Sequence, residues 1–141
     1  LEQGGFMRHY IRHPTDIPIS CTLKDHYYCI HNAMLDVSAG GLRFATEQYI
    51  APGEMIHVNI YVQDPCFEAG CTVKWCRRVD AVYHVGVNFQ TSSEVFSFRM
   101  VEQVCHIEHY KRQVYEKEGR VLNGEQAAQE WINKYAGHFP R

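Results

Sequence analysis

Two short groups of residues in this sequence have types and spacings that suit binding of a phosphate-bearing ligand. The first is a pair of arginines four residues apart, Arg8 and Arg12, and the second is Asp36, Ser38 and Gly41. An arginine guanidinium is a planar fork that binds a phosphate, or O6 and N7 of guanine, through two parallel hydrogen bonds. The arginine pair therefore indicates contacts to phosphates or to guanine.

Asp36 has the opposite requirement, because a carboxylate accepts hydrogen bonds such as those from N1–H and the N2 amino group of guanine. Ser38 can donate to a phosphate oxygen. Gly40 and Gly41 allow positive φ angles and let backbone N–H groups approach an anion closely. A plain anion would not need Asp36, so the set favours a guanine nucleotide that carries phosphodiesters.

Each group also has an alternative that needs no ligand. Asp36 and Ser38 are residues that form turns before glycine, and Arg8 and Arg12 could belong to a solvated terminal arm. His9 could add positive charge below neutral pH or be an ordinary surface histidine.

The elements that would carry these residues are mainly strands. Apolar residues alternate with polar ones in the two-residue period of half-buried strands from Ile17 to about Phe89. We predict six strands, over residues 17–24, 27–35, 42–45, 55–62, 69–76 and 83–89. Short strands with regular turn signals favour an antiparallel sandwich or a small barrel, and closure into a six-stranded antiparallel β-barrel would remove exposed edges.

The period then becomes helical. Thr91 and Glu94 have the spacing of a capping box, and a helix is expected to continue to a stop at Gly119. A second helix is predicted over 123–136, with Asn123 and Gln126 as its capping pair. We divide the chain into an N-terminal tail or cloning remnant (1–7), the barrel with the following helix (8–119) and a C-terminal helical extension (120–141).

The order of the two motifs is specific. RxxxR before the first strand, followed by DxSxxG at the turn after the second, resembles the signature of PilZ domains. The entry Arg12-His13-Pro14-Thr15-Asp16-Ile17-Pro18 and the last strand Tyr83-His84-Val85-Gly86-Val87-Asn88-Phe89 are similar to that family too. The resemblance implies a six-stranded barrel with cyclic di-GMP bound on its outside.

The resemblance also implies the site residues. Arg8 and Arg12 would bind guanine Hoogsteen edges and phosphates. Asp36 would bind the Watson–Crick edge of one guanine. Ser38 and Gly41 would secure the turn and contact a phosphate. Weaker candidates are His9, Gly40 and Trp75. Trp75 shares an alternation face with Val73, so burial in the barrel is an equal expectation.

Other functions have less support in the sequence. The formal net charge of −2 offers no general attraction for DNA or RNA, and no segment has the pattern of a membrane helix or a signal peptide. Cys66, Cys71 and Cys76 recur every five residues, which reverses the strand face each time, so we predict no metal site. No nucleophile elbow or P-loop is present, and we expect neither catalysis nor a cofactor.

The sequence thus predicts a cytoplasmic, non-enzymatic receptor for cyclic di-GMP. It would pass the level of this messenger to a protein partner, in motility, pilus, biofilm or polysaccharide control as the resemblance implies. The alternative is an adaptor that binds only protein and needs no nucleotide. A zinc-dependent enzyme is a third, weaker possibility.

Overall fold

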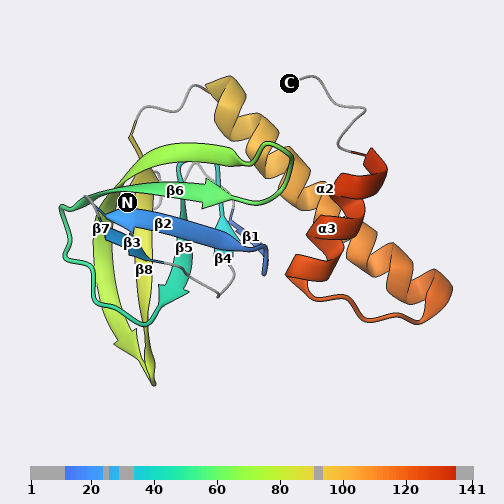
Figure 1. Cartoon of the computed structure of the whole chain (residues 1–141), viewed down its shortest axis with the longest axis horizontal. Helices are drawn as coiled ribbons and strands as arrows, with labels where there is room; N and C mark the ends of the chain where they lie inside the picture. Colours follow the sequence, from blue (N-terminus) through green and yellow to red (C-terminus); the bar gives the residue numbers. More distant parts are fainter. Residues whose placement is uncertain (1–11, 24–25, 29–33, 91–93, 136–141) are drawn as a thin grey trace, which may run out of the picture.

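The computed structural model describes residues 12–23, 26–28, 34–90 and 94–135 of the chain. This part forms an eight-stranded sheet and two helices (Figure 1). The elements are β1 (His13–Pro14), β2 (Ile19–Leu23), β3 (His26–Tyr28), β4 (Met34–Val37), β5 (Gly41–Thr46), β6 (Met55–Ile60), β7 (Phe67–Val79), β8 (Val82–Phe89), α2 (Glu94–Glu118) and α3 (Gly124–Tyr135).

All pairings in the sheet are antiparallel, in the order β1-β4-β5-β8-β7-β6-β2-β3. The first strand segment, residues 13–23, contributes β1 at one end of this order and β2 next to the other end, because β1 pairs with β4 and β2 pairs with β6 and β3. Between them, the Met34 backbone N–H donates to the carbonyl of Ile17 at 2.8 Å. A bent first segment therefore curls the sheet around its core.

The predicted class, an antiparallel β fold followed by helices, is confirmed, but the sheet has eight strands instead of six. β1 lies before the first predicted strand (17–24), which corresponds to β2 alone; Pro18, whose nitrogen cannot donate to a ladder, lies between β1 and β2. The second is divided into β3 and β4, with residues 29–33 outside the described part. No pairing joins β1 to β3 within the described ranges, so the sheet is not a closed barrel there.

One hydrophobic core joins the sheet to both helices. Along β6, the side chains of Ile56, Val58 and Ile60 are buried and alternate with more exposed ones, as the sequence pattern predicts. Met100 of α2 and Trp131 of α3 belong to the same core. Burial of each large apolar side chain stabilises the fold by about 1.5–3 kcal/mol, so the helices are integral to it.

The helix boundaries follow local signals. α2 ends before Gly119, whose φ of 68° is the left-handed conformation typical of a helix C-terminus. At the start of α3, Gln126 N–H donates to Asn123 Oδ1 at 2.8 Å and Asn123 N–H donates to Gln126 Oε1 at 3.0 Å. The predicted capping pair is therefore confirmed. α2 begins at Glu94, and Thr91 lies outside the described residues.

Candidate functional site

The carboxylate of Asp36 is bound by two arginines, one at each oxygen. Arg12 Nη1 donates to Oδ1 at 2.9 Å. Arg43 binds Oδ2 through Nε at 3.0 Å and Nη2 at 2.8 Å. The Asp36 side chain is only 8% exposed, whereas that of Arg12 is 57% exposed. The carboxylate is thus held in place while one of its arginines remains open to solvent.

Arg43 was missed in the sequence analysis. It pairs with Asp36 across the turn between β4 and β5, and Val37 pairs with Leu42 inside that pair. Side chains of directly paired residues lie on the same face of a sheet. In an antiparallel hairpin, residues at equal distances from the turn pair with each other, so the position of the turn places Arg43 opposite Asp36. The sequence therefore contained the information that predicts this pair.

Ser38 acts as a turn residue in this structure. Its hydroxyl is buried, donates to the carbonyl of Gly41 at 3.4 Å and accepts from the N–H of Gly40 at 3.3 Å. The Ser38 backbone N–H also donates to the Gly41 carbonyl, at 2.8 Å. Ser38 thus stabilises the turn, whereas Asp36 makes ion pairs.

The two glycines of the motif do not use positive φ angles, contrary to the expectation from sequence. Gly41 is required for another reason, because a Cβ at this position would collide with the carbonyl oxygen of Val87 on β8. The motif glycine thus allows β5 to approach β8 closely. The Gly40 carbonyl accepts from the Phe89 N–H at 3.0 Å, which further joins the turn to β8.

Trp75 lies on the face opposite to that of Val73, which corrects the shared face inferred from alternation. Val73 pairs with Val87, but Trp75 pairs with the adjacent residue Gly86, so β7 contains a bulge between them. A bulge inserts one residue and reverses the alternation beyond it. The Trp75 side chain is half-buried and lies over Gly86, where a Cβ would collide with the indole.

The bulge completes a row of residues across four strands on the outer face of the sheet. Asp36 of β4 pairs with Arg43 of β5, Arg43 pairs with Gly86 of β8, and Gly86 pairs with Trp75 of β7. The exposed Arg77 places its guanidinium carbon 4.5 Å from the Trp75 ring centroid. This row combines an oriented carboxylate, arginines and an aromatic ring, the groups that bind a purine nucleotide.

The sequence-predicted site residues are only partly brought together. Arg12 contacts Asp36. Ser38 and Gly41 shape the turn beside this ion pair. Trp75 lies farther along the same row. Gly40 joins the turn through its backbone. Arg8 and His9 lie outside the described residues.

The cysteines of the core do not have reactive character. Burial raises the pKa of Cys21 and of Cys71 to about 12, so both thiols stay protonated at neutral pH. Because thiolate is the form that attacks electrophiles and binds metals, these residues are structural. Within the described ranges, no three His, Cys, Asp or Glu side chains gather in a group that could hold a metal ion.

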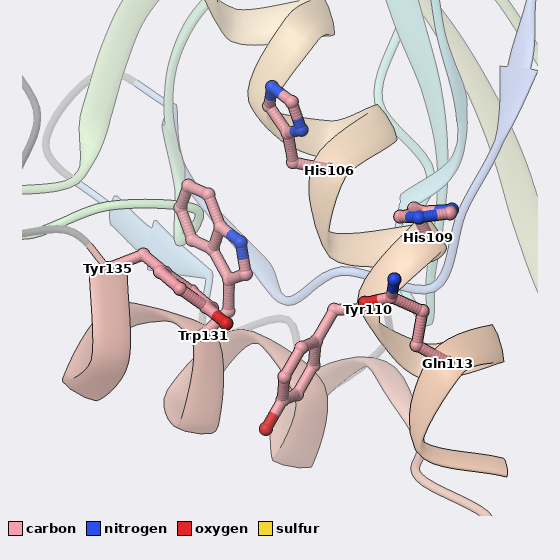
Figure 2. A pocket seen from close by; sticks show the side chains of 6 residues that line it. All are labelled: His106, His109, Tyr110, Gln113, Trp131 and Tyr135. Atoms are coloured by element: carbon pink, nitrogen blue, oxygen red, sulfur yellow. The ribbon is translucent and has the colours of Figure 1, made fainter. Parts of the chain in front are cut away.

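A pocket of about 220 Å³ lies elsewhere, between α2 and α3. Figure 2 shows its lining, which is formed by His106, His109, Tyr110, Gln113, Trp131 and Tyr135. The imidazole of His106 stacks on the indole of Trp131, with ring centroids 6.3 Å apart and an interplanar angle of 12°. None of the motif residues lines this pocket, so it is separate from the site around Asp36.

The sequence matches the family model of the PilZ domain over residues 7–104. The chain therefore belongs to the PilZ family. No curated protein matches the sequence significantly.

Several solved structures resemble the fold. The PilZ domain of YcgR from Escherichia coli with c-di-GMP has a TM-score of 0.59 at 16% identity, over 81% of this chain and 98% of that one. The inhibitor of motility MotI/DgrA of Bacillus subtilis has a TM-score of 0.59 at 13% identity and 74% coverage of this chain. YcgR in complex with c-di-GMP has a TM-score of 0.58 at 17% identity and 78% coverage.

The matched region spans only 52% of the MotI/DgrA chain and 50% of the YcgR chain. At these identities the likeness concerns the fold, which agrees with the family match. Neither α2 nor α3 is long and apolar enough to cross a membrane.

Proposed function

We propose that the protein is a receptor for cyclic di-GMP, which binds on the outer face of the sheet around Asp36. The observation that carries this proposal is the buried Asp36 carboxylate, oriented by Arg12 and Arg43 at the end of β4. Membership of the PilZ family supports it, as do the c-di-GMP complexes of structurally similar YcgR.

The carboxylate has unused capacity for a guanine. An ionised carboxylate offers roughly four lone-pair sites, and Arg12 with Arg43 leaves part of them free. N1–H and the N2 amino group of guanine would donate there. Arg43 would stay on Asp36 and keep it in position, whereas the exposed Arg12 would turn toward a phosphate or a guanine Hoogsteen edge.

The other end of the row supplies a surface for a base. Trp75 lies over Gly86 on the Asp36 face, and the guanidinium of Arg77 lies over the Trp75 ring. We propose that Arg77 turns from this ring to neutralise a phosphate and that Trp75 then stacks on one base. Arg8, with His9 as a weaker contributor, would complete the phosphate contacts. Ser38, Gly40 and Gly41 would act by fixing the turn.

The receptor would act by binding and not by catalysis. We assign the nucleotide-binding unit to residues 8–119, which include α2, and treat residues 120–141 as a C-terminal helical extension of it. The signal would reach a protein partner in motility, pilus, biofilm or polysaccharide control. Val95 and Phe98 are exposed apolar residues three apart on α2, which makes them candidate contacts for that partner.

Calorimetric titration of c-di-GMP into matched variants tests the proposed site. We expect saturable binding by the wild type, and at least tenfold weaker binding by both Arg12→Ala and Asp36→Ala. Arg78→Ala is the control, because it removes an exposed arginine near the hairpin end of β7. Equal affinity of all four proteins, or a loss shared by the control, would contradict the proposed site.

A further inference from the structure

A short segment joins the candidate ligand site to the C-terminal helices. Residues His13–Asp16 directly follow Arg12, and β1 pairs His13 with Val37 and Pro14 with Asp36. One side of the segment is therefore fixed to the strand that carries the site. Its side chains contact α2 and α3.

Three contacts connect this segment to one face of α2. His13 Nδ1 lies 3.7 Å from Cys105 Sγ, and the Thr15 hydroxyl donates to Glu108 Oε2 at 3.1 Å. Lys111 Nζ donates to Asp16 Oδ1 at 2.6 Å. Residues 105, 108 and 111 are spaced by three, so the segment follows α2 along nearly two turns.

The second oxygen of Asp16 connects the segment to α3. The backbone N–H of Gly124, at the start of α3, donates to Asp16 Oδ2 at 2.7 Å. Negative charge is favourable at a helix N-terminus, where N–H groups have no intrahelical partner. A Cβ at Gly124 would collide with the backbone carbonyl of Asp16, so the two backbones are in close contact. A single carboxylate thus holds both helices.

This arrangement gives ligand binding a direct route to the helices. Binding to Arg12 and Asp36 would change the contact between these residues and hence the position of β1 against β4. Asp16 is four residue steps from Arg12, and an extended chain of this length spans at most about 14 Å. A shift of the Arg12 backbone would therefore act close to Asp16 and to its contacts with Lys111 and Gly124.

We infer that the segment His13–Asp16 transmits occupancy of the nucleotide site to the α2–α3 hairpin, which is the output element of the receptor. This inference rests on the proposed function. Linkage requires reciprocity: if the ligand changes the packing of the hairpin, changes in the hairpin alter the affinity for the ligand. The hairpin packing is already organised around Trp131, which is buried and stacks on His106 (Figure 2).

The two tryptophans of the chain allow a specific test, because Trp75 lies in the candidate site and Trp131 in the hairpin. In Trp75→Phe, the fluorescence comes from Trp131 alone. We expect c-di-GMP to change this fluorescence saturably, with the midpoint found by calorimetry on the same variant. Lys111→Gln in this background should retain binding but give a much smaller change, whereas the control Lys117→Gln should respond fully.

The outcomes separate this inference from the proposed function. Calorimetric binding without any change at Trp131 would overturn the transmission route and leave the receptor intact. An absence of binding to the wild type would overturn both. If Trp75→Phe alone fails to bind, fluorine NMR of wild-type protein labelled with 5-fluorotryptophan resolves Trp75 and Trp131, and a Trp131 resonance unmoved by bound ligand would contradict the inference.

Discussion

Arg43 and Asp36 face each other across the turn from β4 to β5, and two guanidinium nitrogens of Arg43 bind the same oxygen of Asp36, at 3.0 and 2.8 Å. The carboxylate therefore has a fixed orientation before any ligand is present. A binding group that is already oriented loses less conformational freedom on association, which favours affinity. Asp36 and Arg43 together form the central unit of the candidate site.

Replacement of Arg43 should weaken ligand binding through the orientation of Asp36. Because Arg43 is partly exposed, we expect Arg43→Ala to reduce the free energy of unfolding by only about 1–2 kcal/mol. The c-di-GMP affinity should fall about tenfold or more, since 1.4 kcal/mol corresponds to a factor of ten. Arg43→Lys keeps the charge without the two-nitrogen contact and should recover part of the affinity. Calorimetry and urea denaturation would measure both, and unchanged affinity in Arg43→Ala would refute the role.

The glycine of the motif should be needed for packing between strands. Gly41→Ala places a Cβ against the Val87 carbonyl and should reduce the free energy of unfolding by about 1–3 kcal/mol. Gly70→Ala is a matched control in β7, where the added Cβ would meet only the mobile end of the Gln90 side chain, at 2.8 Å. Urea denaturation should show a clearly larger loss for Gly41→Ala. Equal losses would show that the close approach of β5 to β8 is not the constraint.

The sequence was sufficient for the periodic parts of this fold. Alternation correctly identified the core side of β6, at Ile56, Val58 and Ile60, and the capping pair of α3 followed from its spacing. Alternation failed at Trp75, because a single bulged residue reverses the face and leaves no clear trace in composition. The sequence was also sufficient to place Arg43 opposite Asp36, because that pairing follows from the position of the turn alone.

The contacts of Asp16 could not have been predicted in this way. Lys111 and Gly124 lie 95 and 108 residues from it in sequence, and no local pattern relates positions so far apart. Only the packing of α2 and α3 against the sheet brings these residues together. Part of the candidate site follows from local spacing, and its connection to the helices follows from tertiary structure.

Trp75 should contribute to ligand affinity by stacking. Base–aromatic stacking is worth about 1–3 kcal/mol per base, so Trp75→Ala should weaken c-di-GMP binding roughly 5- to 140-fold. Trp75→Phe keeps an aromatic face and should retain most of the affinity. Titration calorimetry distinguishes the two variants. If both variants bind equally weakly, the indole is needed for its packing on Gly86, and stacking on a base does not explain the loss.

The hairpin should lose stability in acid. Hydrogen bonds from Arg120, then from Tyr110, lower the pKa of Glu130 to about 2. A free glutamate has a pKa of about 4.3, so the stabilisation is complete above that pH and is lost as the pH falls toward 2. The melting temperature of the wild type should exceed that of Glu130→Gln near neutral pH, and the difference should shrink below about pH 4. A difference that is independent of pH would contradict this assignment.

The most direct test of the account is a calorimetric comparison of c-di-GMP with cyclic di-AMP on the wild-type protein. The N1–H and N2 amino group of guanine match the acceptor oxygens of Asp36, whereas adenine lacks both donors on that edge. We expect saturable binding of c-di-GMP and binding of cyclic di-AMP that is at least a hundredfold weaker. Equal binding of the two dinucleotides, or no binding of c-di-GMP, would contradict it.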